Sequence, residues 1–310
     1  MKVLVTGGAG FIGSNFVTRS LATRTGVEFT VLDALTYAGN LSNLITVQSE
    51  INFIHGDIRD ADLVESVVSK AELVVHFAAE SHNDNSLKNP EIFLETNVMG
   101  TLNLIQAATK HGTRFHHIST DEVFGDLPLD SIEKFNRDTP YNPSSPYSAS
   151  KASSDHLVRA WVRSFGLKAT ITNCSNNFGP NQHQEKLIPK TIATLLSGQR
   201  PQLYGTGLNV RDWIHVDDHV DGIWAALDKG TIGETYLLGA NQESTNIGVV
   251  NLIASAIGRE DVDIEFIQDR PGHDRRYAID TEAATKELGW QASTLMNEAT
   301  LAPLVSGYRN

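Results

Sequence analysis

The sequence is poor in cysteine and in basic residues. Its 310 residues include one cysteine, Cys174, so no disulfide can form within the chain and no cysteine cluster suggests structural zinc. Lys and Arg number 25 against 37 Asp and Glu, and the net charge of −12 leaves no basic stripe for a phosphate backbone. We therefore expect no metal site, no nucleic-acid partner and a reducing, cytoplasmic setting.

Long apolar runs are also missing, and no stretch is long enough to cross a bilayer. The first residues, 2–6, have the pattern of a strand rather than that of a charged leader followed by an apolar signal core. We therefore expect neither a membrane partner nor secretion. The length suffices to bury the core of one large unit or of two joined domains.

Short β-branched runs alternate with longer amphipathic stretches, which is the pattern of βαβ units and a parallel sheet. The pattern predicts strands at 2–6, 29–32, 52–55, 73–77, 115–119 and 169–173, and helices at 12–23, 61–68, 91–110 and 147–165, with Asp60 as the N-cap of the second helix. After about Cys174 we expect loops and shorter helices at 187–196, 217–227 and 247–257. We predict an α/β fold, with a Rossmann-type doubly wound parallel sheet in residues 1–173. A smaller C-terminal substrate-binding domain would occupy residues 174–310, with some segments returning to the first domain.

A glycine-rich turn, Gly7-Gly8-Ala9-Gly10-Phe11-Ile12-Gly13, follows the first predicted strand and opens the first helix. Glycines at 7, 10 and 13 allow a tight turn, close approach of the backbone to a pyrophosphate and close helix–sheet packing. Asp33 ends the next strand, where a carboxylate accepts from ribose hydroxyls and repels a 2′-phosphate, so we predict NAD rather than NADP. Asp57-Ile58 fits a contact with adenine, and Asp57 fits equally well a turn at a helix entry.

Two further motifs indicate chemistry. Tyr147 and Lys151 stand at i and i+4 on one helix face, where the ammonium can lower the pKa of the phenol and leave a phenolate that accepts a hydroxyl proton. That is the base of a nicotinamide-dependent alcohol oxidation. Thr120-Asp121-Glu122 directly follows the predicted strand 115–119, at the edge where open α/β sheets bind ligands. Its two acids add a proton donor and a proton acceptor, which suggests elimination of water.

Both motifs also have a simpler interpretation. Thr120 can cap a helical turn beside two solvated acids, and a Tyr and Lys four apart can be a surface pair. The strand-end position of the first motif, the presence of the second and the stiff entry Pro143-Ser144-Ser145-Pro146 favour an active site.

Other reactive side chains have ordinary interpretations. His116-His117 lies in a predicted strand without a third ligand at metal spacing, so we expect packed histidines. Cys174 has no partner His or local basic group and is expected to be a small buried residue. Arginines 211, 270, 275 and 276 can be surface charges or, in this acidic chain, ligands of a diphosphate.

At these residues the chain resembles the extended short-chain dehydrogenase/reductase family, and more closely its sugar-nucleotide 4,6-dehydratases, from end to end. The glycine turn is shared by the whole superfamily. The combination of Thr120-Asp121-Glu122, Asn173-Cys174-Ser175-Asn176-Asn177 and Asp269-Arg270-Pro271-Gly272-His273-Asp274-Arg275-Arg276-Tyr277 is specific to the dehydratases. Further matching segments are 35–40, 77–82, 145–151, 185–189 and 211–213.

The resemblance implies NAD as cofactor and dTDP-glucose as substrate. Beyond the glycines Gly7, Gly10 and Gly13, it places cofactor contacts on Phe11, Ile12, Asp33, Leu35, Thr36, Asp57, Ile58, Ala78, Ala79, Thr96, Tyr147, Lys151 and Asn177. It places substrate contacts on Ser81, Thr120, Asn176, Lys186, Leu187, Tyr204, Arg211, Asn246, Asp269, Arg270, Pro271, Gly272 and His273.

The resemblance also implies a mechanism without net redox change, that of a lyase in deoxysugar biosynthesis. Tyr147 removes the proton of the C4 hydroxyl while the C4 hydride passes to NAD⁺, Lys151 holds the phenolate and the nicotinamide ribose, and Thr120 orients the C4 oxygen. Glu122 then takes the C5 proton, Asp121 protonates the departing C6 hydroxyl, and the hydride returns to C6. The product would be the 4-keto-6-deoxy sugar nucleotide.

The chain departs from the family pattern at Asn83, Asn85, Phe124, Asn181 and Gln184, of which Asn83 and Asn85 lie near the expected cofactor pocket. A sugar-nucleotide 4-epimerase or decarboxylase would share the glycine turn and the Tyr/Lys pair without needing the two adjacent acids. A non-catalytic NAD(H)-sensing module would need only the glycines. The family's dimer implies a homodimer built from the paired helices 91–110 and 147–165.

Overall fold

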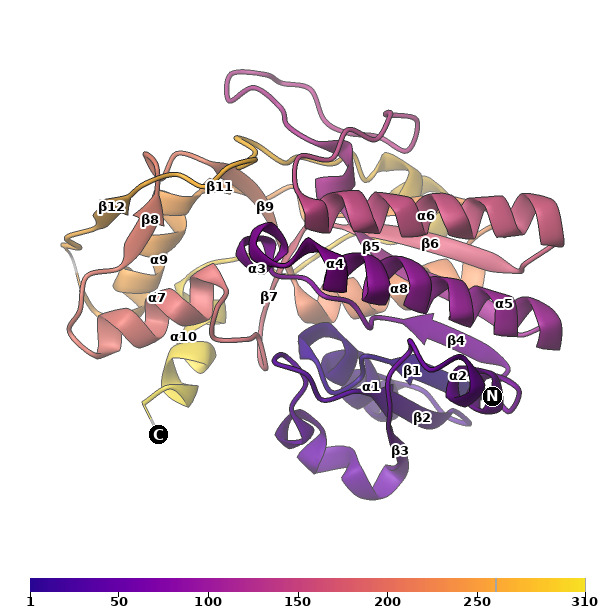
Figure 1. Cartoon of the computed structure of the whole chain (residues 1–310). Coiled ribbons are helices and arrows are strands. Elements are labelled where there is room, and N and C mark those ends of the chain that lie inside the picture. Colours follow the sequence, from indigo (N-terminus) through magenta and orange to yellow (C-terminus); the bar gives the residue numbers. More distant parts are fainter. Residues whose placement is uncertain (260, 310) are drawn as a thin grey trace.

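The computed structural model describes residues 1–259 and 261–309, and its centre is an all-parallel sheet (Figure 1). Seven strands follow the order β3-β2-β1-β4-β5-β6-β10. They are β1 (Lys2–Thr6), β2 (Glu28–Asp33), β3 (Ile51–His55), β4 (Leu73–His76), β5 (Arg114–Thr120), β6 (Ala169–Cys174) and β10 (Thr235–Leu238). The strand order reverses between β1 and β4, which is where doubly wound sheets bind ligands. The predicted fold class is confirmed, and the six predicted strands end within one residue of the observed bounds.

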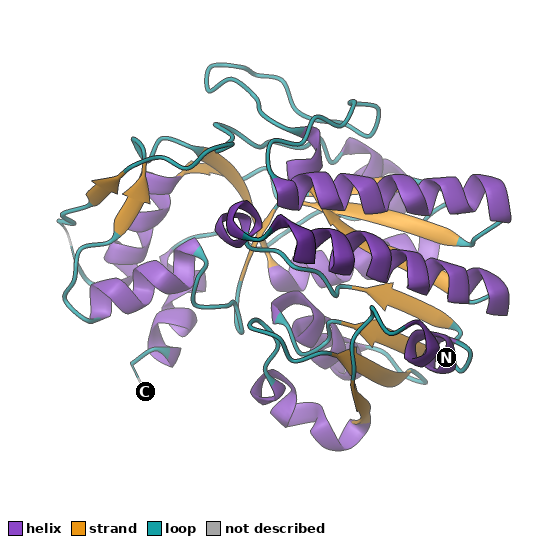
Figure 2. Cartoon of the chain, in the orientation of Figure 1, coloured by secondary structure: helices purple, strands orange, loops and turns teal. Residues whose placement is uncertain are grey.

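Helices cover both faces of the sheet (Figure 2). Val3 and Val5 of β1 belong to a buried cluster with α1 (Phe11–Thr23) and α8 (Val216–Lys229). Leu4, pointing the other way, belongs to a cluster with α2 (Ala61–Val68), α5 (Thr101–His111) and α6 (Pro146–Phe165). The sheet is therefore covered on both faces, and every residue of β4 and β6 is buried.

Helix α6 owes its sharp start to a capping box. The Ser145 hydroxyl accepts from the Ser148 amide at 3.1 Å, the Ser145 amide donates to the Ser148 hydroxyl at 3.0 Å, and Pro146 occupies the first turn. The helix ends at Gly166, whose φ of 71° is left-handed. These caps set the register that carries Tyr147 and Lys151 on the first two turns. Asp60 caps α2 as predicted, accepting from the Leu63 amide at 3.0 Å.

The predicted single helix 91–110 is three segments in the structure. It comprises α4 (Pro90–Phe93), a π-helix η2 (Leu94–Gly100) and α5. The π turn places the buried Asn97 amide so that it accepts from the Glu80 amide at 2.8 Å and donates to the Ser150 hydroxyl at 2.8 Å. The irregularity therefore ties the loop after β4 to α6, which a regular 3.6-residue repeat does not reveal.

The C-terminal half contains α7 (Leu187–Leu196), α8 and α9 (Asn246–Ile257), close to the predicted helices. Their neighbours were predicted as loops. A three-stranded sheet joins β7 (Asn176–Phe178), β9 (Val210–His215) and β11 (Glu243–Thr245), and β8 (Gln202–Tyr204) pairs with β12 (Glu265–Ile267). Strand β10 lies in the main sheet beside β6. The remaining segments are η1 (Leu41–Glu50), α3 (Asn83–Lys88), η3 (Asp121–Phe124), η4 (Ala284–Leu288) and α10 (Glu298–Gly307). The division into two domains at residue 173 stays a prediction.

Within residues 1–259 and 261–309, no helix has the length and apolar character that a membrane span requires. The same part of the chain holds no group of three His, Cys, Asp or Glu side chains placed to bind a metal ion.

Candidate active site

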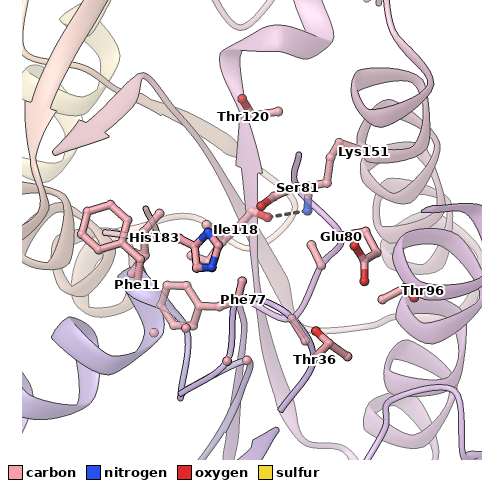
Figure 3. A pocket seen from close by; sticks show the side chains of 18 of the residues that line it. Phe11, Thr36, Phe77, Glu80, Ser81, Thr96, Ile118, Thr120, Lys151 and His183 are labelled. Atoms are coloured by element: carbon pink, nitrogen blue, oxygen red, sulfur yellow. Dashed lines mark hydrogen bonds between the residues drawn. The ribbon is translucent and has the colours of Figure 1, made fainter. Parts of the chain in front are cut away.

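A cavity of about 450 Å³ lies at the carboxyl ends of the central strands. Figure 3 shows side chains from several separate loops pointing into it, among them Phe11, Thr36, Ser81 and His183. All five predicted catalytic residues line it, as do all predicted cofactor residues except Leu35. Of the predicted substrate residues, only Ser81, Thr120, Asn176 and Lys186 reach its wall.

The glycine turn needs glycine for packing as well as for conformation. Gly7 has φ of 70°, and a Cβ there would lie 2.5 Å from the Ala78 nitrogen. A Cβ on Gly13 would lie 2.3 Å from the Gly7 carbonyl oxygen. The N-cap of helix α1 is Gly10, which has no side chain to accept a hydrogen bond from the first backbone amides of the helix. These amides lie at the wall of the cavity. Such a helix start suits a phosphate group.

Asp33 is buried where β2 ends. Its Oδ2 accepts from the Ala9 amide at 2.9 Å and its Oδ1 from the Leu35 amide at 2.8 Å. Burial raises its pKa, while these two hydrogen bonds act in the opposite direction. Asp57 also lines the cavity, but its carboxylate pairs with Arg59 at 2.7 Å and accepts from the Arg59 amide. In the structure Asp57 therefore stabilises a turn, which was one of its two interpretations. Its place in the cavity wall also leaves it accessible to a ligand.

Lys151 and Tyr147 are buried on the first turns of α6. The Lys151 ammonium donates to the Ile118 carbonyl at 2.7 Å, drawn as a dashed line in Figure 3, and burial lowers its pKa to about 8. Burial raises the pKa of Tyr147 well above its usual value, and the Glu122 charge adds to this. The predicted lowering of the phenol's pKa by the lysine is therefore wrong for this structure, because desolvation outweighs a cation that is bound elsewhere.

The adjacent acids have different surroundings. Asp121 is 1% exposed, and its Oδ2 has no hydrogen-bond partner among the described residues. Burial, then the charges of Glu122 and Asp212, raise its pKa well above the usual range. Glu122 is half-buried, and its Oε2 accepts from the Asn83 amide at 2.9 Å. Hence the surroundings of Asp121 favour its protonated form, whereas Glu122 is more exposed and is held by a hydrogen bond from Asn83.

A buried network lies beneath Lys151. Asp155, one turn further along α6, accepts from the Ser119 hydroxyl at 2.9 Å and the Tyr141 hydroxyl at 2.8 Å, and lies 3.2 Å from His117. Although burial opposes ionisation, His117 and the nearby cations lower the pKa of Asp155 to about 2. Asp155 was not predicted, although its i+4 spacing from Lys151 was a usable signal. His117 is a buried histidine packed against the rings of His76 and Phe115, and the prediction of a packed histidine is confirmed.

His116 and Cys174 are also packed as predicted. His116 is buried between the Thr170 and Thr172 hydroxyls, at 2.7 and 3.2 Å. Cys174 is buried and donates its thiol hydrogen to the Ser119 carbonyl at 3.4 Å.

The predicted substrate residues beyond the cavity wall form a second set. The Tyr204 hydroxyl donates to Asp84 at 2.7 Å, Arg270 pairs with Asp84 at 3.3 Å, and His273 lies 2.7 Å from Asp269. Arg211 stacks over the Tyr277 ring at 4.1 Å and donates to the Asp274 carbonyl at 2.8 Å. Leu187, Asn246, Pro271 and Gly272 belong to the same C-terminal part and do not line the cavity.

The four arginines considered as diphosphate ligands have different environments. Arg276 is buried and pairs with Glu243 at 2.6 Å, and Arg275 pairs with Asp126 at 2.6 Å on the surface. Both side chains thus pair with acids within the chain, as Arg270 does with Asp84, whereas Arg211 donates to the Asp274 carbonyl and its charge acts on Asp121.

Several residues that line the cavity were not predicted. They include Glu80, Gln182, His183 and Glu185, from the loops after β4 and β7. Glu185 lies 3.8 Å from His82 and 3.6 Å from His183. Glu80 and Glu185 adjoin predicted positions in the sequence, but polar loop residues carry no periodic signal.

The family model described as GDP-mannose 4,6 dehydratase matches residues 4–300. The chain is 54% identical to the dTDP-glucose 4,6-dehydratase of Mycolicibacterium smegmatis, over 100% of this chain and 93% of that protein. It is 45% identical to dTDP-glucose 4,6-dehydratase 1 of Escherichia coli, over 94% of this chain and 88% of that protein.

Solved structures agree with these relatives. The dTDP-glucose 4,6-dehydratase of Streptomyces venezuelae with NAD and dTDP bound has a TM-score of 0.95 at 44% identity, covering 100% of this chain and 97% of that one. A UDP-glucose 4-epimerase of Thermotoga maritima has a TM-score of 0.91 at 28% identity, covering 100% and 99%. The fold is thus common to both enzyme classes, whereas the sequence relatives are dehydratases. The chain therefore belongs to the family described as GDP-mannose 4,6 dehydratase and, within it, to the dTDP-glucose 4,6-dehydratases.

Proposed function

We infer that this chain is an NAD-dependent hydro-lyase that converts dTDP-glucose to dTDP-4-keto-6-deoxyglucose. The observation that carries this inference is the pair Asp121 and Glu122, held in unlike environments beside Tyr147 and Lys151. A hydride transfer at C4 needs only the tyrosine and lysine. A buried carboxyl group with a raised pKa, Asp121, next to the half-buried carboxyl group of Glu122, supplies the acid and the base that elimination of water requires in addition.

The residues present fit NAD. The start of α1 has no side-chain cap, and Gly7 has no side chain, so the backbone there can bind a pyrophosphate. Asp33 lies in the cavity wall at the end of β2, where it would contact the adenosine ribose. When bound, NAD⁺ accepts the C4 hydride, returns it to C6 and adds a positive charge that favours ionisation of a nearby phenol. Relatives of this family have been crystallised with NAD.

In the first half-reaction we assign the base to Tyr147. Its phenolate oxygen takes the proton from the C4 hydroxyl. With NAD⁺ bound, the positive charge of the cofactor favours that phenolate, and Lys151 holds the nicotinamide ribose. Thr120, whose hydroxyl donates to Asp121 Oδ1 at 3.3 Å, orients the C4 oxygen. The C–H bond at C4 breaks with its electron pair, which leaves a 4-keto sugar whose C5 hydrogen is acidic.

In the second half-reaction the two carboxyl groups divide the work. Glu122 removes the C5 proton, and Asp121 gives its proton to the C6 hydroxyl, which leaves as water and creates a C5–C6 double bond. Hydride addition at C6 and a proton at C5 then complete the product. The sugar loses one water in total, and the cofactor returns to its starting oxidation state.

The substrate's nucleotide end is assigned to the C-terminal residues. Ser81, Asn176 and Lys186 line the cavity next to the catalytic groups, and Lys186 donates to the Ser81 carbonyl at 3.1 Å. Further out, we assign the remaining predicted residues to the diphosphate and base: Leu187, Tyr204, Arg211, Asn246, Asp269, Arg270, Pro271, Gly272 and His273. Arg270 and Arg211 supply the positive charge for that role.

We also propose a homodimer in the cytoplasm. Large apolar side chains are exposed on the layer of η2, α5 and α6, which lie side by side in Figure 1. Leu94 and Met99 are each 52% exposed, and Phe165 is 60% exposed. Pairing of this layer with a second copy would cover them.

Product analysis tests the proposed function. The purified protein, supplied with NAD⁺ and dTDP-glucose, is expected to form the 4-keto-6-deoxy sugar nucleotide. Formation of dTDP-galactose instead would support the epimerase alternative, and recovery of unchanged substrate with bound NAD would support the sensing module.

A further inference from the structure

We propose that Asn83 is a positioning residue that holds the Glu122 carboxylate for abstraction of the C5 proton. Asn83 opens the short helix α3 and belongs to none of the predicted catalytic, cofactor or substrate sets. The inference rests on the function proposed above, in which Glu122 is the base.

The geometry fixes both ends of the Asn83 amide. Its Nδ2 donates to Glu122 Oε2 at 2.9 Å, and its Oδ1 accepts from the Ser145 hydroxyl at 2.8 Å. Since an amide has one donor end and one acceptor end, the two partners together select a single orientation. Ser145 is the N-cap of α6, so this amide connects Glu122 to the start of the helix that carries Tyr147.

Helix α3 is itself held from two sides. The Ser86 hydroxyl donates to the Asn83 carbonyl at 2.7 Å. The next residue, Asp84, accepts from the Tyr204 hydroxyl at 2.7 Å and pairs with Arg270 at 3.3 Å. The Asn83 side chain therefore projects from a fixed turn.

The hydrogen bond has two consequences for the base. The donor at Oε2 fixes the direction in which the carboxylate points. It also leaves Oε1, which has no hydrogen-bond partner among residues 1–259 and 261–309, as the oxygen free to meet the substrate. The titratable groups that face Glu122 come from its own turn, from α6, from the start of α7 and from the C-terminal part; they are Asp121, Tyr147, Lys186, Asp274 and Tyr277.

Three variants of the full-length protein test the proposal. Asn83→Leu keeps the size of the side chain but removes the donor. Asn83→Asp keeps the shape and the acceptor for Ser145 but replaces the donor with a charge that repels Glu122. Asn89→Leu makes the same change six residues further along the chain, at an exposed position where no side-chain hydrogen bond to Glu122 or Ser145 exists in the described part of the chain. Two steps are measured with dTDP-glucose: formation of bound NADH, and exchange of the C5 hydrogen with heavy water.

Asn83→Leu is expected to slow C5 exchange about tenfold, at the lower end of what a hydrogen bond to a charged group contributes, with NADH formation unchanged. Asn83→Asp should slow exchange at least as much and move the acidic limb of its pH profile to higher pH, because a like charge disfavours the ionised base. Asn89→Leu should match the wild type in both steps.

Exchange at the wild-type rate in both Asn83 variants would overturn the proposal. An equal loss of both steps in Asn83→Asp, which keeps the acceptor for Ser145, would do the same, since the effect would then not be specific to abstraction of the C5 proton. Failure of the wild-type protein to oxidise dTDP-glucose would instead reject the proposed function, so the two failures are distinguishable.

Discussion

Replacing Asp121 by Asn should make the stability of the protein less sensitive to rising pH. Asp121 is 1% exposed, and burial raises the pKa of its carboxyl group well above the usual range, with the charges of Glu122 and Asp212 adding to the effect. A carboxyl group with a raised pKa stays protonated in the folded chain after it has ionised in the unfolded chain. Its contribution to stability is therefore complete below the unfolded pKa and is lost as the pH rises toward the folded value.

The magnitude follows from this linkage. Between the two pKa values, the unfolding free energy of the wild type relative to Asp121→Asn falls by about 1.4 kcal/mol per pH unit, the cost of one retained proton. For a chain of this length, with an unfolding entropy of roughly 2 cal/mol/K per residue, that slope corresponds to roughly 2 °C of melting temperature per pH unit. The variant has no carboxyl group at this position, so it has no such slope.

Thermal unfolding of the two proteins, in steps from about pH 4.5 to about pH 7.5, measures the difference directly. The melting temperature of the variant relative to that of the wild type should rise with each step in pH. This difference should level off once the pH exceeds the pKa of Asp121 in the folded protein. A constant difference over the whole range would refute the reasoning, because it would mean that Asp121 is already ionised in the folded protein and cannot be the proton donor.

Three other substitutions test separate parts of the account. Asp33→Ala should reduce the preference for NAD over NADP in equilibrium binding, because the carboxylate opposes a 2′-phosphate; an unchanged preference would remove Asp33 from that role. Tyr147→Phe should slow formation of bound NADH from dTDP-glucose about a hundredfold or more while the melting temperature stays within a few degrees of the wild type, and normal oxidation would reject it as the base. Asp155→Asn should lower the unfolding free energy by about 3 kcal/mol near pH 7. The pKa of Asp155 is lowered to about 2, so this deficit should shrink as the pH falls below about 4; a deficit independent of pH would contradict the buried ionic network.

The N-terminal half could be predicted because its strands and helices are long and locally patterned. The run Lys2–Thr6 alternates between two buried clusters, and α2 and α6 carry capping residues that sequence alone identifies. The short strands β7, β8, β11 and β12 have three residues each, which is too few for a period, and their partners lie far along the chain. Strand β10 was missed for the same reason, although it completes the main sheet.

The catalytic motifs could be predicted because each stands at a recognisable place, a strand end or a helix start. The sequence pattern did not show which residues form hydrogen bonds with the side chains of these motifs. Asn83 donates a hydrogen bond to Glu122, which lies 39 residues later in the sequence. Asp155 accepts hydrogen bonds from residues of three separate segments. The direction of the pKa shift of Tyr147 was predicted wrongly. The i, i+4 spacing indicates a neighbouring lysine, but it carries no information on the burial of the phenol, which raises the pKa.

The most direct test of the account is the fate of the C4 hydrogen. The protein is incubated with NAD⁺ and dTDP-glucose carrying deuterium at C4, and the product is analysed by NMR and mass spectrometry. The account predicts a 4-keto-6-deoxy sugar nucleotide with the deuterium at C6 and with hydrogen from solvent at C5. Deuterium retained at C4 of an epimerised sugar, or a 6-deoxy product without deuterium at C6, would contradict it.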